Sequence, residues 1–381
     1  MKQTNNAIKF LMAQYRAIFN HAYFKGLATA ALVTVAMAAG QAQAASGTFA
    51  DFISGSSKTD VKGNFTLSQS ETISGSSGGF FTNLTIANGG HLKYDSSSNV
   101  NKDHLRVKEN VIVEKGGILS ITGAQSQGQG LYGTFDDTFD DNPNSKLQVN
   151  GGELNITQAM IQISKVELTD AIVNISKHIG HNTNSDWEDN AMLGATLAGD
   201  KDGNIIAGTG VLSVKGNSNI TLDSGSQIYA NTLNLEGGKI DMKGTEKDSS
   251  GSIIRGFSHG AINVNGTDIN VSGSGNYIVA HNINLTGAES AITVSGNSVL
   301  HLSGDLDKNA NASASAKATT VNLNGATLNI AKNGSIVVNN ADSVFNATSG
   351  NITNSGSITF NNKLVVKLKS HCINTTNLLS Q

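Results

Sequence analysis

Proline and cysteine are almost absent from this sequence of 381 residues, in which Pro143 and Cys372 are the sole examples. Proline cannot donate to a strand ladder, so its rarity suits many short paired strands. A lone cysteine excludes an internal disulfide, so stability must come from packing and backbone ladders. Aromatic residues make up 5% and charged residues 14%, whereas 42 residues are glycine. This composition is atypical of disordered chains, helix-rich folds and ordinary globular enzymes.

Acidic residues are absent from positions 1–44, which carry four basic residues: Lys2, Lys9, Arg16 and Lys25. An apolar run over residues 27–39 leads to Ala42-Gln43-Ala44, with small residues at the positions that a signal peptidase recognises. The run is well short of the roughly 20 residues that a membrane-spanning helix requires. A mitochondrial presequence would fit the basic part but not the apolar run and the Ala-x-Ala site. We therefore predict a helical signal peptide over residues 1–44, cleaved after Ala44, with the Sec export machinery and signal peptidase as partners.

Arginine is scarce after the signal peptide, where Arg106 and Arg255 are the only two. The whole chain has 26 basic and 29 acidic residues, and removal of the four basic residues of the signal peptide leaves 22 − 29 = −7. A nucleic-acid-binding domain typically has a basic face rich in arginine and lysine. We therefore expect no nucleic-acid partner.

A recurring cassette dominates the rest of the chain: two apolar residues one apart, a short Gly/Asn turn, and two more apolar residues one apart. In one copy, residues 147–149 (LQV) lead through NGGE into residues 154–156 (LNI). Such alternation predicts short strands with one buried face. Further copies lie at residues 233–242, 262–271 and 321–330, with looser ones at 84–94 and 111–121.

The cassettes also recur at a longer period. Three pairs of cassette positions are 21 residues apart: Leu212 and Leu233, Ile262 and Ile283, and Leu300 and Val321. A fixed period of about 20 residues is typical of architectures in which one turn of chain is one coil. We therefore predict an all-β fold, a right-handed parallel β-helix with two or three short strands per coil. About twelve coils at ~4.8 Å each would give a rod of about 60 Å.

Asn-Gly pairs are expected at the corners of each coil, where the backbone needs a positive φ. The pairs begin at Asn88, Asn150, Asn265, Asn324 and Asn333. The alternative fold is a string of antiparallel hairpins, because Asn-Gly is also a strong hairpin signal. Hairpins would have arms too short for a barrel or sandwich, and they would leave the longer period unexplained.

Longer inserts interrupt the repeat at residues 123–146, 177–210, 244–261 and 305–318. Loops on a rigid scaffold are where such proteins bind, so partners are expected there. We place the β-helix domain at residues 45–362 and a non-repeat tail at residues 363–381, which contain no glycine. A solenoid cut there leaves an unpaired edge, so we expect self-association unless the tail forms a cap.

The exported N-terminus and the Gly-Gly or Asn-Gly cassettes resemble the passenger part of type V autotransporter proteins of Gram-negative bacteria, over roughly residues 46–360. The resemblance implies a Sec-exported β-helix that passes through an outer-membrane translocator barrel and is displayed at the cell surface, frequently as an adhesin. Such a barrel needs many alternating strands of ~10 residues, and nothing after residue 362 supplies them. The gene product is then truncated or frameshifted, or it relies on a separate transporter.

An exported structural or adhesive protein that binds a surface glycan or protein receptor is the function we expect, without enzyme activity. Its location would be the cell surface or medium, or the periplasm if the translocator is truly missing. The alternative is a carbohydrate-active β-helix enzyme, a polysaccharide lyase or hydrolase. Such an enzyme needs acids with a base or arginine at equivalent positions of successive coils, whereas Glu153, Glu236 and Asp241 are scattered.

Three serine motifs are candidate hydrolase signals, of which residues 75–79 (GSSGG) lack the aspartate altogether. Residues 256–260 fit G-x-S-x-G around Ser258, but a nucleophile elbow needs a preceding strand and a following helix in an α/β sheet. Residues 223–226 (DSGS) are similar to the core of the protease passengers, with Leu222 where those have glycine. We interpret residues 223–226 as an ordinary corner.

Metal ligands are suggested by two acidic segments and one histidine pair. Calcium could bind the aspartates at 136, 137, 140 and 141, or residues 200–204, although Val211 stands where the second site needs a bidentate acid. His178 and His181 lack a spacing specific for a transition metal, and Trp187 nearby is a candidate contact for a partner. We assign no catalytic, cofactor-binding or metal-binding residue and expect no cofactor.

Overall fold

The computed structural model describes residues 47–74, 78–97, 104–124, 129–133, 142–177, 191–196, 207–245, 251–304, 318–338 and 342–360. For residues 257–259, 365–368, 373–375 and 379–380 it describes the backbone alone. The chain divides into two units between Ala45 and Ser46. The predicted helical signal peptide therefore falls outside the described residues. Within the described part, no helix is both long and apolar enough to cross a membrane.

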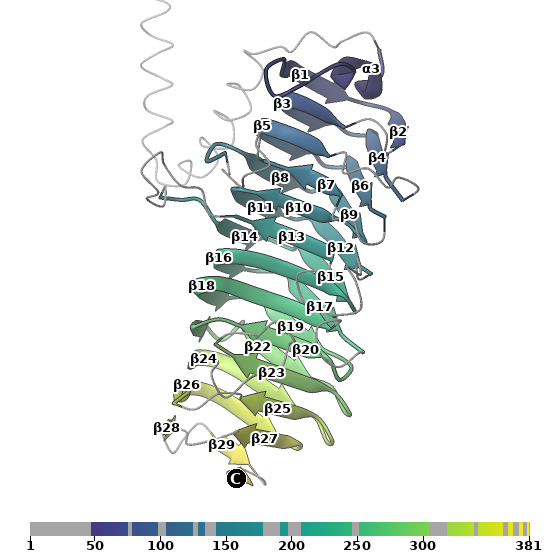
Figure 1. The fold of residues 1–381 in the computed structure, drawn as a ribbon. Helices are drawn as coiled ribbons and strands as arrows, with labels where there is room; N and C mark the ends of the chain where they lie inside the picture. Colours follow the sequence, from purple (N-terminus) through teal and green to yellow (C-terminus); the bar gives the residue numbers. More distant parts are fainter. Residues whose placement is uncertain are drawn as a thin grey trace, which may run out of the picture. The chain divides into compact units, whose positions relative to one another are not determined.

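Residues after this division form a parallel β-helix with three faces (Figure 1). Every pairing between named strands is parallel, and each inner strand pairs with its equivalents in the preceding and following coils. The predicted all-β solenoid is therefore confirmed, and the hairpin alternative is wrong. Antiparallel pairing among the described residues is limited to an isolated bridge between Ser57 and Asp60.

The first face contains the first half of each cassette. Its strands, in stacking order, are β1 (Lys62–Leu67), β3 (Gly79–Ile86), β5 (Leu105–Val113), β8 (Lys146–Asn150), β11 (Lys165–Thr169), β14 (Val211–Lys215), β16 (Ser226–Glu236), β18 (Ser252–Asn265), β21 (Asn282–Thr286), β24 (Thr320–Ile330), β26 (Val344–Asn354) and β28 (Val365–Leu368). Six of these, β3, β5, β16, β18, β24 and β26, turn a corner and also contribute to a neighbouring face.

The second face contains the second half of each cassette. Its strands are β2 (Ser70–Ser74), β4 (His91–Asp95), β6 (Ile118–Thr122), β9 (Glu153–Thr157), β12 (Ile172–Ser176), β15 (Asn219–Asp223), β17 (Lys239–Lys243), β19 (Asp268–Val271), β22 (Ala291–Val294), the second halves of β24 and β26, and β29 (Ile373–Thr375). These twelve segments agree with the expected number of coils.

The third face completes each coil. It consists of the first halves of β3, β5, β16 and β18 together with β7 (Gly130–Tyr132), β10 (Met160–Ile163), β13 (Ala191–Ala195), β20 (Asn276–Val279), β23 (Val299–Ser303), β25 (Ser335–Val338), β27 (Ser357–Phe360) and β30 (Leu379–Ser380). The cassette pattern did not reveal this face.

Three of the four predicted inserts contain a strand of the third face. The strand β7 lies within residues 123–146, β13 lies within 177–210, and the first half of β18 lies within 244–261. Alternation fails in β13 because both of its sides are covered: all five of its residues are buried. The same holds outside the inserts for β20, all four of whose residues are buried. A strand buried on both sides loses the period-two pattern.

The pairing of residues between neighbouring strands shows which of the three predicted 21-residue spacings correspond to one coil. Leu212 pairs with the residue 21 positions later, and so does Ile262. The third spacing is wrong, because Leu300 lies on the third face and Val321 on the first. The insert at residues 305–318 lengthens that coil, so equivalent positions on β21 and β24 are 38 residues apart.

The interior is a single column of aliphatic side chains contributed by all three faces. The inward residues of the described strands are almost completely buried, as for Leu154 on the second face and Ile161 on the third. Burial of a leucine or isoleucine contributes about 1.5–3 kcal/mol. Because each coil covers the next, this apolar stack stabilises the fold without a disulfide.

The corners follow the predicted chemistry. After Asn88, Asn150, Asn265 and Asn324 the following glycine has a positive φ of 69–83°. At the fifth corner Asn333 itself adopts a φ of 65°. The Asn-Gly pairs thus turn the chain between faces, and not between hairpin arms.

The short helix α3 (Phe49–Ile53) covers the N-terminal end of the stack. The Phe49 ring is completely buried and lies 5.3 Å from the rings of both Phe65 and Phe81. The Glu71 carboxylate on β2 accepts from the backbone N–H groups of Phe49 (2.7 Å) and Ala50 (2.8 Å), which a helix leaves unsatisfied. The helix therefore seals the apolar end beside the edge strands β1 and β2.

The backbone of the predicted tail continues the three-face arrangement. Strands β28 and β29 pair in parallel with β26, and β30 pairs with β27. The stack thus extends beyond the boundary that we predicted at residue 362.

Candidate binding surface on the third face

The outward side of the first face is a ladder of asparagine amides. In each of four steps the amide nitrogen of one coil donates to the amide oxygen of the preceding coil, over 2.8–3.0 Å. The residues are Asn234, Asn263, Asn284, Asn322 and Asn346. The three inner amides each donate and accept within the ladder, and the Asn346 oxygen at its C-terminal end has no hydrogen-bond partner.

The outward side of the third face has a different composition. Over the residues that pair on this face, its described strands contain Arg106 and Arg255, which are both arginines of the predicted mature chain, and no lysine, aspartate or glutamate. The next residues of β5, Lys108 and Glu109, lie at the corner. Register places the outward residues in two columns. One column runs Phe80, Arg106, Tyr132, Gln162, Gly194, Tyr229, Arg255, Val279 and the other Met160, Met192, Gln227, Ile253, Tyr277, His301, Val337.

An aromatic ring precedes each arginine by one coil. The Arg106 guanidinium carbon lies 5.8 Å from the centre of the Phe80 ring, and that of Arg255 lies 5.9 Å from the Tyr229 ring. Both distances are within the ~6 Å range of cation–π attraction. An arginine therefore lies over an aromatic ring of the preceding coil at two places along one column.

The N-terminal of these two groups, the Arg106 cluster, consists of Phe80, His104, Arg106, Tyr132 and Met160, all partly exposed. The His104 and Tyr132 rings are 4.6 Å apart, and the Tyr132 hydroxyl lies 3.5 Å from the Met160 sulfur. Burial raises the pKa of the Tyr132 phenol, and the Arg106 charge opposes this shift. The phenol is therefore neutral at physiological pH.

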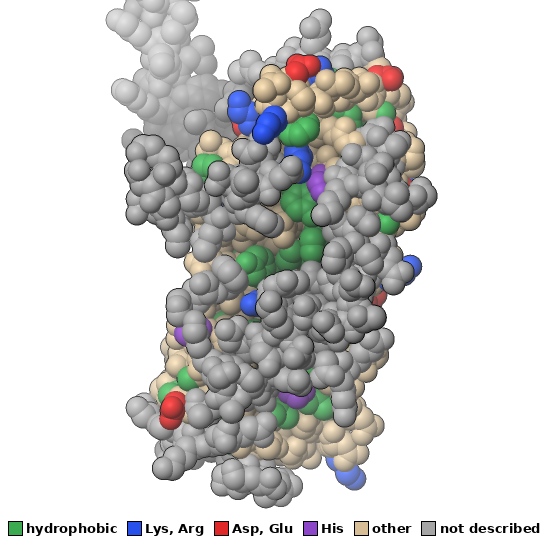
Figure 2. Space-filling view, viewed as in Figure 1, with side chains coloured by type: hydrophobic (Ala, Val, Ile, Leu, Met, Phe, Trp, Pro, Cys, Tyr) green, Lys and Arg blue, Asp and Glu red, His purple; other side chains and the backbone are tan. Residues whose placement is uncertain are grey.

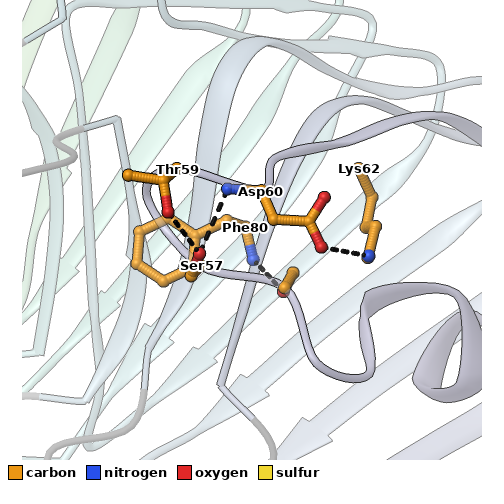
Figure 3. Close-up of polar contacts among 6 residues, drawn as sticks. Ser57, Thr59, Asp60, Lys62 and Phe80 are labelled. Atoms are coloured by element: carbon orange, nitrogen blue, oxygen red, sulfur yellow. Dashed lines mark hydrogen bonds and ion pairs between the residues drawn. The ribbon is translucent and has the colours of Figure 1, made fainter.

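The turn after α3 fixes the backbone of Phe80 (Figure 3). The Phe80 N–H donates to the Ser56 hydroxyl over 2.8 Å. Next to it, the Asp60 N–H donates to the Ser57 hydroxyl over 3.1 Å, and the Asp60 carboxylate pairs with Lys62 at 2.8 Å. The capping segment thus supports one end of the Arg106 cluster.

The second group is more deeply covered. Arg255 is 6% exposed, and Ile253 (0%), Tyr277 (5%) and Val279 (1%) form an apolar cluster separate from the core. The rings of Tyr277 and His301 stack at 4.8 Å. This second group is packed like an interior, whereas the side chains of the Arg106 cluster are partly exposed.

Figure 2 shows hydrophobic side chains of the described residues in a strip along the stack, with basic and histidine side chains among them. Sequence reasoning missed this surface because it searched for polar motifs. Two signals could have found it: the scarcity of arginine, and non-alternating segments such as SIIRG and NYIV.

The predicted corner at residues 223–226 is confirmed. Asp223 ends β15, a turn with Gly225 at a φ of 75° follows, and Ser226 begins β16. The Ser226 hydroxyl donates to the Asp223 carbonyl, and the Ser224 hydroxyl lies 2.9 Å from that of Thr245. Both hydroxyls thus hold backbone corners together.

The other candidate residues lie outside the described part. These are the aspartates at 136, 137, 140 and 141, residues 200–204, His178, His181 and Trp187, and the side chain of Ser258. Among the described residues, no three His, Cys, Asp or Glu side chains gather as metal ligands would. The calcium and transition-metal hypotheses therefore stay predictions.

Carboxylates of the described strands are separated from one another in the stack. Asp241 lies between Thr221 and Asn270 in register, and Glu236 lies beside Lys215. No described aspartate or glutamate has another acid as its register partner. The paired acids that a β-helix lyase or hydrolase needs are not found on these strands.

Comparisons with known proteins give no match to any family model, to any curated protein or to any solved structure.

Proposed function

We propose that this protein is an exported, surface-displayed β-helix of the autotransporter-passenger type, and that it binds other surfaces through its third face. The observation that carries the proposal is the position of the cap. The α3 segment begins with its N-cap Thr48, close after the predicted cleavage site at Ala44. A chain that starts at Ala45 would retain its whole folded unit, as an exported domain requires.

The third face supports an adhesive role. Large partly exposed aromatic residues and arginine are enriched where proteins bind partners, whereas lysine and acids are depleted. The Arg106 cluster has this composition, and the amide ladder of the first face does not. A scaffold of stacked coils keeps such a surface rigid, so little conformational entropy is lost on binding.

Export is tested by expressing the full chain in a Gram-negative host and sequencing the N-terminus of the protein from each cell fraction. We expect the exported protein to begin at Ala45. The matched control is Ala44→Leu, which removes a small residue from the cleavage site and should leave the signal peptide attached. Recovery of an intact Met1 from the cytoplasm in both cases would contradict the proposal.

Adhesion is tested with beads that carry the purified chain from Ala45 onward. We expect them to bind host or neighbouring cells more strongly than beads that carry the same chain after denaturation. A Gln162→Lys variant places a charge in the outward column of the third face and should weaken this attachment. Equal attachment of folded and denatured protein would contradict an adhesive role.

A further inference from the structure

Four outward carboxylates of the first and second faces are paired with lysines. On the second face, Asp95 and Asp241 have a lysine ammonium at 3.0 and 2.8 Å. On the first face, Glu167 and Glu236 have one at 2.8 and 3.8 Å. Each pair neutralises its own charge at the surface, so it offers little attraction to a charged partner.

Glu153, the first residue of β9, has no such lysine. The Asn155 amide donates to its Oε1 atom over 2.8 Å, which holds the side chain in place. Among the described residues, no lysine or arginine lies within ion-pair distance of this carboxylate, and its Oε2 atom accepts no hydrogen bond. An ionised carboxylate can accept several hydrogen bonds, so Glu153 has acceptor sites left for a partner.

Isoleucines flank Glu153 on both sides. Register places Ile118 of the preceding coil and Ile172 of the following coil directly beside it, in one outward column of the second face. The Ile172 side chain is 49% exposed, and it is the one large hydrophobic side chain of the described residues in the exposed class. A single exposed aliphatic side chain needs no explanation. Two of them beside an acid without a lysine form a surface that is acidic at its centre and apolar on either side.

Nearby charges add to that of Glu153. The corners that lead into β6, β9 and β12 contain Glu114, Lys115 and Asp170, which are two acids and one base. The predicted mature chain has a net charge of 22 − 29 = −7. A field of this sign attracts cations and repels polyanions. The surface around Glu153 and the chain as a whole thus favour the same kind of partner, one that is positively charged.

A lysine or arginine side chain has the chemistry that matches this surface. Such a side chain ends in a cation and carries it on an aliphatic stem, which packs along apolar surface while the charged end stays in water. A hydrogen bond from an ammonium or guanidinium to a carboxylate is stronger than one between neutral groups. A metal ion would gain nothing from the isoleucines and would need several oxygen ligands.

We propose that Glu153, Ile118 and Ile172, the Glu153 patch, dock a basic segment of a protein partner. A lysine or arginine of this segment pairs with the Glu153 carboxylate, and its stem packs against the two isoleucines. The patch lies on the second face, so the inference goes beyond the proposed function, which concerns the third face.

Binding is measured by fluorescence anisotropy with the chain from Ala45 onward. The probe is a labelled dodecapeptide in which lysine alternates with pairs of serines. Three comparison peptides replace lysine by diaminobutyrate, which keeps the charge on a shorter stem, by norleucine, which keeps the stem without the charge, or by glutamate. We expect the lysine peptide to bind about threefold more tightly than the diaminobutyrate peptide, and at least about tenfold more tightly than the other two.

Variants of the patch separate the charge from the apolar contact. Glu153→Gln keeps an acceptor for Asn155 and removes the charge, so it should weaken binding of the lysine peptide about three- to fivefold. Ile172→Ser keeps the charge and should weaken binding about threefold, while the diaminobutyrate peptide should bind it as it binds the original protein.

The matched control is Asp268→Asn. Asp268 is an exposed acid of the same outward column, but its register partners are a lysine and an alanine. Its replacement removes the same charge from the chain and should change the affinity for the lysine peptide by less than about 1.5-fold.

The proposal is overturned if Glu153→Gln binds the lysine peptide as tightly as the original protein while both unfold at the same temperature. It is also overturned if Asp268→Asn weakens binding equally, because the attraction would then come from the charge of the whole chain. Equal binding of the lysine and diaminobutyrate peptides would contradict the contact with the isoleucines. Gln162→Lys on the third face should leave peptide binding intact, and its loss in that variant would contradict a separate site.

Discussion

The first and third faces are built from the same parallel ladders, yet their outward sides differ. Along the first face, Asn263 and its equivalents donate and accept within one column, so each coil satisfies the next. Along the third face, the Arg106 guanidinium lies over the Phe80 ring, and the strand residues that pair on this face include no carboxylate. The coil geometry therefore fixes the position of each side chain. The identity of the outward residues decides whether a face only stabilises the fold or can also bind a partner.

The largest loss in the free energy of unfolding is expected at the cap, the helix α3 that covers the N-terminal end of the stack. Phe49→Ala removes a completely buried ring that packs on Phe65 and Phe81. Loss of such a ring costs about 3–5 kcal/mol. Hydrogen exchange should show the β1–β3 coil opening first, together with concentration-dependent association through the uncovered edge. Exchange that accelerates equally along the whole stack would contradict a local cap.

The covered part of the third face should behave like core. Ile253 points outward and Ile254 inward, and both are completely buried. We expect Ile253→Ala and Ile254→Ala each to lower the free energy of unfolding by about 2–4 kcal/mol, measured with urea. A loss below about 0.5 kcal/mol for Ile253→Ala alone would show that this side is not packed in solution.

The amide ladder should matter less than either apolar site. Asn284 donates to Asn263 and accepts from Asn322, so Asn284→Ala removes two hydrogen bonds. The expected loss is about 1–2 kcal/mol in urea unfolding, since each bond contributes about 1 kcal/mol. The control is Lys332→Ala at an exposed corner, with less than about 0.5 kcal/mol expected. Equal losses in the two variants would argue against a stabilising ladder.

We expect alkaline pH to destabilise the packing around Tyr132 in the Arg106 cluster. Burial raises the pKa of Tyr132 above its usual 10.0, against the effect of Arg106. The neutral phenol is therefore favoured by folding below pH 10, and this stabilisation is lost as the pH rises further. Absorbance of tyrosinate, compared between the original protein and Tyr132→Phe, should show Tyr132 ionising above pH 10. Ionisation of Tyr132 near pH 10 in the folded protein would contradict its burial.

The smallest change in the free energy of unfolding is expected for Asp95 on the second face. Its hydrogen bond from Ser97 (2.6 Å), helped by Lys93 (3.0 Å), lowers the pKa of this carboxyl below its usual 3.8. The stabilisation is present above pH 3.8 and is lost as the pH falls through the lowered value. Asp95→Asn should cost no more than about 0.5 kcal/mol at pH 7 and nothing at pH 2. A cost independent of pH would contradict the ionised carboxylate as its source.

Much of the fold was determined by the sequence itself. Apolar alternation around Asn-Gly corners predicted the strands of the first two faces, because each has one buried and one solvated side. The coil period appeared in two of three spacings. It failed at Leu300 because the chain from β23 on the third face, through the insert, to β24 on the first face also spans 21 residues. The corner at Asp223 was predicted for the same local reason.

The candidate surface was decided by tertiary structure alone. Phe80, Arg106 and Tyr132 are separated by 26 positions at each step, and nothing local in the chain marks them as neighbours. Their contact depends on the number of residues in the corners and inserts of each coil, and this number varies along the chain. The sequence by itself thus determined that strands stack into coils and which side chains point inward. Only the register of the stacked coils decided which outward residues meet, because contacts between coils depend on the path of the whole turn.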